Sequence, residues 1–157
     1  MTVNYKLLGV PYIVAASSAT GMSTTGDTNE NTLATITIPA GAMGANGIVR
    51  ITTVSSHTNS GNTKILRIKF GGTTYASISV TTTATHRQQT QIANRNSASS
   101  QIGSNTSASS FGASSGAAVT SSVDTASAVT VLITGQNGLG SETITLESYL
   151  VEVIYKA

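Results

Sequence analysis

Short runs of β-forming residues recur along the whole chain and are separated by residues that favour turns. In "TLATITIPAG", Leu33, Ile36 and Ile38 stand among threonines, and Pro39 ends the run. A period of two is typical of strands that bury one face, and proline interrupts a strand because it cannot donate a backbone hydrogen bond. No segment has an amphipathic 3.6-residue pattern over three turns. The pattern therefore predicts strands at Val3–Val14, Thr32–Ile38, Gly47–Ser55, Lys64–Phe70, Thr73–Val80, Thr85–Asn94, Ala128–Thr134 and Glu142–Tyr155.

Strands joined by turns, without helices, predict an all-β protein. Because eight strands are typical of a jelly roll, we predict an antiparallel β-sandwich of jelly-roll type with about eight strands. It is expected to form a single domain over residues 1–157. The last predicted strand changes the phase of its apolar positions near Ser148, which indicates a bulge or a bend there.

The N-terminal segment, residues 1–14, has two interpretations. Lys6 and the apolar stretch after it imitate a short signal peptide. However, Pro11 and Tyr12 interrupt that stretch, and an edge strand bent at Pro11 explains the same residues. We favour the strand and expect residues 1–14 to form an arm whose Pro11 and Tyr12 contact a neighbouring subunit or a shell.

The segment "TKILRIKFGGTTY", residues 63–75, concentrates three of the chain's eight cationic side chains, Lys64, Arg67 and Lys69. Two glycines at 71 and 72 predict a two-residue hairpin turn after this strand. We expect the cations to line the outer face of the strand, where charge discourages edge pairing with another chain. The alternative is an interface at which they meet carboxylates of a neighbour, such as those of residues 142, 147 and 152.

Residues 97–122, "SASSQIGSNTSASSFGASSGAAVTSS", form a Ser/Ala/Gly-rich segment that we expect to be a loop. It is far longer than a usual connection, and such loops tend to be functional or disordered. Phe111 could anchor its middle. Both a mobile loop and a loop ordered against neighbouring subunits are compatible with this composition.

Composition narrows the function classes. Only 9% of residues are charged, against about 25% in typical domains, and 26 threonines and 22 serines supply the polar surface instead. A formal charge of +2 gives no clustered positive field for nucleic acid. The absence of cysteine excludes disulfides and thiolate zinc sites. No apolar run approaches the roughly 20 residues of a membrane span.

The residues with chemical potential do not form a recognisable site. "GASSG", residues 112–116, matches a nucleophile elbow around Ser114, but its flanks lack the strand and helix that such an elbow needs. His57 and His86 are expected on the surface, and nothing in the sequence brings them together with Asp27 or Asp124. "GDTNEN", residues 26–31, resembles half a calcium loop but is equally typical of a turn, and "GQNGLG", residues 135–140, is also expected to be a turn. We predict no catalytic, cofactor-binding or metal-ligating residues.

A resemblance emerges over most of the chain outside the Ser-rich segment. "ATITIPAGAMGANGIVRITTVSSHTNSGNTKILRIKFGGTTY", residues 34–75, resembles a group of small virion proteins of tailed bacteriophages. "NRNS" at 94–97, "ITGQ" at 133–136 and "ITLESYLVEVI" at 144–154 match the same group. The resemblance implies a jelly-roll-like sandwich on the particle surface, as head cement or as part of a fibre, and it implies no catalytic residue.

From the residues and the resemblance together we expect a non-enzymatic structural protein of a tailed-phage virion, without a cofactor. Its leading form is a decoration or cement protein on the head surface, made in the bacterial host cytoplasm. Its expected partners are copies of itself, as a homotrimer, and the major capsid protein or other virion proteins. The alternative is a tail or head fibre component that recognises a host-surface glycan or protein through its loops, among them residues 55–63 and 97–122.

Overall fold

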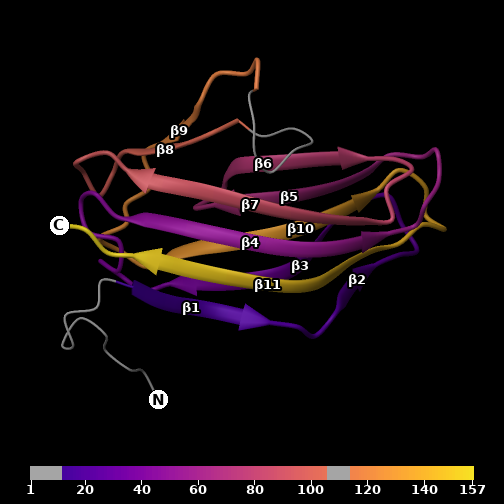
Figure 1. The fold of residues 1–157 in the computed structure, drawn as a ribbon, viewed down its shortest axis with the longest axis horizontal. Coiled ribbons are helices and arrows are strands. Elements are labelled where there is room, and N and C mark those ends of the chain that lie inside the picture. Colours follow the sequence, from indigo (N-terminus) through magenta and orange to yellow (C-terminus); the bar gives the residue numbers. More distant parts are fainter. Residues whose placement is uncertain (1–11, 106–113) are drawn as a thin grey trace.

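The computed structural model describes residues 12–105 and 114–157, and within these ranges it contains strands and no helix (Figure 1). No described segment is therefore a helix long and apolar enough to cross a membrane. The strands are β1 (Tyr12–Ser18), β2 (Met22–Thr24), β3 (Glu30–Ile38), β4 (Ile48–His57), β5 (Lys64–Phe70), β6 (Thr73–Val80), β7 (Thr85–Asn94), β8 (Gln101–Gly103), β9 (Val119–Ser121), β10 (Val129–Asn137) and β11 (Ile144–Ile154).

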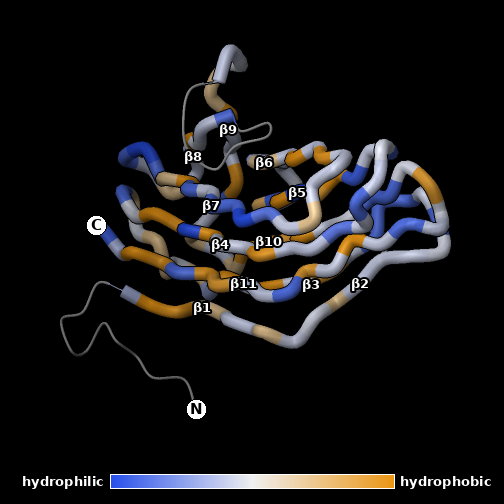
Figure 2. Tube along the Cα trace, turned by 45° about the vertical axis from the view of Figure 1, so that its right-hand side comes forward, coloured by the Kyte–Doolittle hydropathy of each residue, from blue (hydrophilic) through white to orange (hydrophobic). Residues whose placement is uncertain are grey.

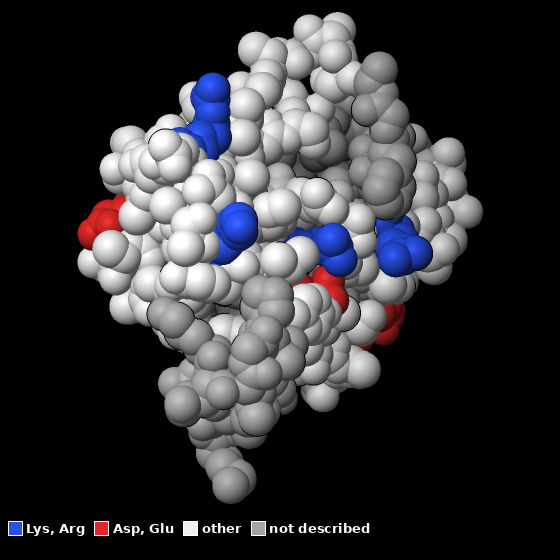
Figure 3. All heavy atoms as spheres, turned by 60° about the vertical axis from the view of Figure 1, so that its left-hand side comes forward, with Lys and Arg blue, Asp and Glu red and all other residues white. Residues whose placement is uncertain are grey.

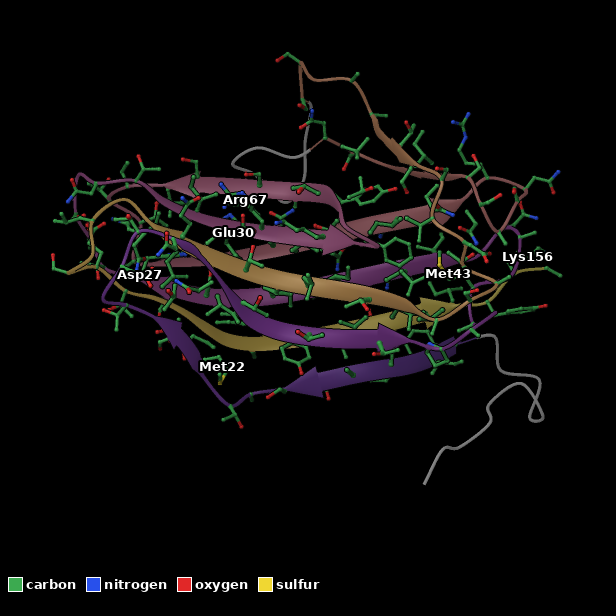
Figure 4. All side chains as sticks on the ribbon, turned by 180° about the vertical axis from the view of Figure 1, so that it is seen from behind. Met22, Asp27, Glu30, Met43, Arg67 and Lys156 are labelled. Atoms are coloured by element: carbon green, nitrogen blue, oxygen red, sulfur yellow. The ribbon has the colours of Figure 1, made fainter. Side chains whose placement is uncertain are left out.

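The strands form two antiparallel sheets that pack face to face as a sandwich. One sheet has seven strands in the order β1-β11-β4-β7-β8-β9, with β2 also paired to β11. The other has four strands in the order β3-β10-β5-β6. Figure 1 looks onto the outer face of the seven-stranded sheet, and Figure 4 shows the molecule from behind, onto the four-stranded sheet.

The connectivity is that of a jelly roll. Without the short strands β2, β8 and β9, eight strands remain, and they pair as first with eighth, second with seventh, third with sixth and fourth with fifth. These are the pairs of one long antiparallel ribbon, which folds over so that β11 also pairs with β4, and β10 with β5. The predicted all-β sandwich of jelly-roll type is confirmed.

The predicted strands agree with the observed ones best where the turns are short. β5, β6 and β7 have the predicted bounds. Gly71 and Gly72, with φ of 54° and 86°, make the tight turn between β5 and β6, which fits a type I′ hairpin because both central residues need positive φ. In β11 the pairing with β4 shifts between Leu146 and Ser148, which confirms the predicted bulge.

The Ser-rich segment is the main difference from the predicted fold. It was expected to be a loop over residues 97–122, but β8 and β9 lie within it and extend the seven-stranded sheet beyond β7. These short runs pair here because β7 supplies a ready edge for β8, and β8 in turn for β9. Residues 106–113, which include Phe111, lie outside the described residues, as do residues 1–11 with Pro11. Of the N-terminal arm 1–14, only the part from Tyr12 onward is described. β1 lies at the edge of its sheet, but it runs from Tyr12 to Ser18 and overlaps the predicted strand Val3–Val14 in three residues only.

A network of buried amides and hydroxyls holds this extension against the sandwich. Asn94 donates through Nδ2 to the carbonyl of Gly44 at 2.6 Å and to Oγ1 of Thr125 at 2.8 Å. Gln101, which is fully buried, donates to Oδ1 of Asn94 at 2.9 Å and accepts from Ser121 at 3.0 Å. Because buried polar groups must find partners, the network fixes the path of the chain between β7 and β10.

The hydrophobic core lies between the two sheets and uses alternate residues of each long strand. In β5 the inward residues are Leu66, Ile68 and Phe70, as the pattern predicts. Figure 2 shows the alternation of hydrophobic and hydrophilic positions along the strands. The largest fully buried apolar side chains are Tyr75, Phe70, Ile38, Met43, Ile51, Leu66, Ile68, Ile78, Ile92, Ile133 and Ile144.

Candidate functional site

The basic strand β5 is divided between the two faces of the four-stranded sheet. Arg67 and Lys69 point outward as expected. Lys64 does not, because it lies two residues before Leu66 and therefore shares the inward face. Its side chain is 0% exposed, so the expectation that it lines an outer surface is wrong. β5 is also not an edge strand, since β10 and β6 pair with it on either side.

Arg67 and Lys69 take part in a cluster that crosses three strands of the outer face. Both cations pair with Glu30 of β3, from Arg67 Nη1 at 3.4 Å and from Lys69 Nζ at 2.5 Å. Thr134 of β10 donates to the same carboxylate at 2.6 Å, and Arg67 donates to Gln136 at 2.9 Å. Figure 4 shows Arg67 and Glu30 close together on this face. The hydrogen bonds from Lys69 and Thr134 lower the pKa of Glu30, so the cluster is a charged brace across β3, β10 and β5.

Lys64 closes one end of the core with residues of two loops. Its Nζ lies 2.9 Å from Oγ of Ser60 and 3.5 Å from Oε1 of Glu142. Glu142, which is 3% exposed, also accepts hydrogen bonds from Ser60 and, at 3.2 Å, from Asn62. These interactions lower the pKa of Glu142, with the hydrogen bond from Ser60 as the largest cause. The partner that was expected on a neighbouring subunit is thus found within the same chain.

The two histidines lie beside this end of the core on adjacent strands. His57 ends β4, and His86 pairs with Ser55 in the register of β4 with β7. Both are partly buried, not surface residues as expected, and Nδ1 of each ring has no hydrogen-bond partner among the described residues. Burial, His86 and Lys64 together lower the pKa of His57 to about 4. Ser55 lies 3.2 Å from Nε2 of His57, but no carboxylate is bonded to either ring in the described structure.

The other candidate chemical residues have structural contacts. Oδ1 of Asp27 accepts from the backbone of Asn29 at 2.9 Å and from the side chain of Asn31 at 2.8 Å, as the turn interpretation predicts. Ser114 accepts a hydrogen bond from the backbone of Gly116 and is exposed. Residues 135–137 of the expected turn continue β10, and the turn itself follows them. Among the described residues no group of three or more His, Asp or Glu side chains could hold a metal ion.

Tyr12, the described member of the expected N-terminal contact, belongs to the outer face of the seven-stranded sheet. Its hydroxyl donates to Glu152 of β11, and Glu152 pairs with Arg50 of β4 at 3.7 Å. On the face that Figure 3 shows, the cations stand mostly among neutral residues. No described surface thus has the dense positive charge that nucleic acid would need.

A depression of 330 Å³ opens on the same outer face, where β4, β7 and β8 meet. Its walls are mostly apolar, and sequence reasoning missed it because it depends on the unpredicted strand β8. The alternation in β4 and β7 would have placed three of its lining residues, Ile48, Gln91 and Ala93, on one face. It is lined by Ile48, Gln91, Ala93, Ile102, Gly103, Ser104 and Ala118.

Comparison with known proteins gives little. No family model and no curated protein sequence matches this chain. Similar solved structures include the infectious bursal disease virus VP2 subviral particle, at 16% identity and a TM-score of 0.34, covering 90% of this chain and 38% of that chain. Structures of the Gx and Gt strains of that virus match at 12% and 15% identity, with TM-scores of 0.31 and 0.29. They cover 91% and 90% of this chain, which spans about two fifths of each matched chain, 40% in both cases. Similarity at this level indicates neither the family nor the function of this chain.

Proposed function

We propose that the protein is a non-enzymatic structural component of a tailed-phage virion, with decoration or cement of the head surface as its leading form. The observation that carries the proposal is that the candidate basic residues form contacts within the chain that stabilise the fold. Lys64, Arg67 and Lys69 are all engaged in ion pairs within the chain that brace the sandwich. The resemblance of residues 34–75 to small virion proteins points the same way, and these residues run from β3 into β6.

The surface properties suit a protein present in many copies. With 9% charged residues and a formal charge of +2, neighbouring copies repel one another weakly. Hydroxyl and amide groups form wet contacts at small cost. We therefore include in the proposal that copies associate with one another, for which the sequence favours a homotrimer, and dock on the major capsid protein or other virion proteins.

Isolation of tail-free heads tests the leading form. Quantitative mass spectrometry of purified heads and purified tails should find this chain in the head fraction, in a fixed ratio to the major capsid protein. Its recovery in the tail fraction alone would exclude the cement form and leave the fibre alternative. Its absence from purified virions would exclude both.

The fibre alternative has weaker support from the structure. Host recognition was expected to use residues 55–63 and 97–122 displayed together. The first loop packs on the β10–β11 turn, where Gly138 donates to the carbonyl of Thr63 at 2.7 Å. The described start of the second segment packs at another place, where Ser97 donates to the carbonyl of Ala45 at 3.0 Å. Binding of the isolated protein to host cells at micromolar concentration would favour this alternative.

A further inference from the structure

The outer face of the seven-stranded sheet carries an apolar stripe that crosses five strands. In register, Tyr12 of β1 lies opposite Ile154 of β11, which lies opposite Ile48 of β4. Ile48 lies opposite Ala93 of β7, and Ala93 opposite Ile102 of β8. All five point away from the core and are partly exposed. Figure 2 shows hydrophobic positions gathered along β1, β4 and β11 toward the C-terminal end of β11.

Beside this stripe, the face has a projection at one end and a depression toward the other. Val14, on the edge strand β1, is 48% exposed and lies opposite Glu152 in the row of residues next to the stripe. The depression lies over β7, between Ile48 and Ile102, and Gln91 from the row of Val14 also lines it. A projection and a hole on opposite sides of one face are the shape that two copies of that face need to fit each other.

The charges of this face also suit two copies that meet face to face. Glu152 and Arg50 stand next to each other on β11 and β4, in the middle of the row that contains Val14. Their charges cancel within the chain, so two such faces can meet without net repulsion. The outer face of the four-stranded sheet differs, because there Arg67 and Lys69 share only one carboxylate, that of Glu30.

We propose that the outer face of the seven-stranded sheet binds a second copy of this chain about a twofold axis that runs along the strands, between β11 and β4. Such an axis brings β11 of each copy over β4 of the other, and β1 over β7. Val14 of one copy then enters the depression of the other, and Ile154 packs on Ile48. Arg50 of each copy meets Glu152 of the other, so one operation satisfies shape, apolar contact and charge.

The size of the surface is compatible with this contact. Five strands at about 4.8 Å spacing, over the three rows from Ile48 to Leu150, give roughly 300–400 Å² of face. The row through Ile48 is apolar, and the other two rows mix apolar with polar and charged residues. A standard interface buries about 800 Å² per partner, with a polar rim around an apolar centre. Thr52, Gln89 and Ser17 share the row of Leu150 and would supply part of that rim.

This contact deepens the proposed self-association by naming its surface, and it favours a dimer over the homotrimer expected from the sequence. Sedimentation equilibrium of the full-length protein at 1–200 µM tests it independently of any virion. The wild type should have twice the monomer mass, and Val14→Lys should weaken the dimer at least tenfold. Leu139→Lys is the matched control, because Leu139 is equally exposed at 49% but lies in the β10–β11 turn, away from this face.

A second pair of variants addresses folding. Ile48→Lys should abolish the dimer, whereas Ile65→Lys, on the outer face of β5, should keep it; both residues are partly exposed isoleucines. Circular dichroism establishes that each variant is folded. A monomeric wild type at 200 µM would overturn the inference, as would a trimer or a dimer that Val14→Lys and Leu139→Lys weaken alike. None of these results would bear on whether the chain is found in virions.

Discussion

Lys64 shows how a single residue can have the opposite role from the one its neighbours suggest. It is close in sequence to Arg67 and Lys69, but strand alternation gives it the face of Leu66 and Phe70. The alternation rule was sufficient to place it inside. The carboxylate that compensates it, Glu142, lies far away in the chain, and only the folded topology brings the two together.

We expect Lys64→Met to lower the free energy of unfolding and the urea midpoint clearly, since it leaves the carboxylate of Glu142 without its cation. Lys64→Met/Glu142→Gln should recover much of that loss, because the uncompensated charge is then removed. Urea unfolding of both variants measures the difference. Arg67→Met, in the partly exposed cluster with Glu30, is the control and should cost less. Equal losses for Lys64→Met and the double variant would contradict the argument.

His57 should make the free energy of unfolding depend on pH, at pH values above those at which the carboxylates titrate. Its pKa is about 4 in the fold, against 6.5 for a free histidine, so the unfolded chain binds the proton more readily between these values. Stability should therefore fall as pH drops through this window. Discounted for its partial exposure, the loss from pH 7 to pH 5 is about 1 kcal/mol.

His57→Gln should remove most of that pH dependence while leaving the loss below pH 4.5. That lower range belongs to groups such as Glu30 and Glu142, whose folded pKa values are lowered and whose stabilisation is lost on protonation. Urea unfolding at pH 7, 5 and 4 separates the two ranges. A variant that loses as much stability as the wild type between pH 7 and pH 5 would assign the effect to another group.

At the scale of elements, a strand was predicted accurately where residues within it and its turn determine it. A strand that depends on distant residues was missed. β5 and β6 were predicted with their bounds because two glycines and the flanking alternation specify a hairpin by themselves. β2, β8 and β9 have three residues each, too few to show an alternating pattern, so their pairing depends on edges that other strands provide. The network of Asn94 and Gln101 that holds β8 has no local signature in the sequence.

The β5–β6 turn offers a test of how the β9 region contacts the sandwich. Gly71 and Gly72 both have positive φ, but a Cβ on Gly71 would lie 2.6 Å from Val123, whereas nothing lies within 4 Å of one on Gly72. Gly72→Ala should cost about 1 kcal/mol, for its backbone conformation alone. Gly71→Ala should cost a further 1–3 kcal/mol from overpacking.

Val123→Ala in the Gly71→Ala background should relieve the overpacking, and thermal unfolding of the three variants measures it. If Gly71→Ala and Gly72→Ala are equally destabilising, the segment after β9 does not press on the turn. The same reasoning applies to Gly103 of β8, whose Cβ would lie 2.6 Å from the ring of Tyr75.

At the scale of the whole molecule, the sandwich and its connectivity followed from the number and order of strands, but the use of its two outer faces did not. The pattern of β11 places Leu150 and Ile154 on the face opposite to Val151 and Val153, and a sequence cannot say whether such apolar residues on a second face are covered. The stripe became visible only when the register aligned residues of five strands. The depression additionally required β8.

The nested pairing of the jelly roll also predicts the order of folding. β5 and β6 are joined by two residues, whereas β1 pairs with β11 across nearly the whole chain, with Tyr12 opposite Ile154. Because loop closure costs more for distant segments and slows folding, we expect β5–β6 to form first and β1–β11 last.

Two conservative variants test this order. Ile78→Val in β6 should slow folding about threefold, whereas Ile144→Val in β11 should mainly speed unfolding. Both sites are fully buried, so each variant should lose about 1 kcal/mol of stability. Stopped-flow folding and unfolding in urea measures both limbs, and a folding rate lowered as much by Ile144→Val as by Ile78→Val would show that the ribbon does not close from its hairpin end.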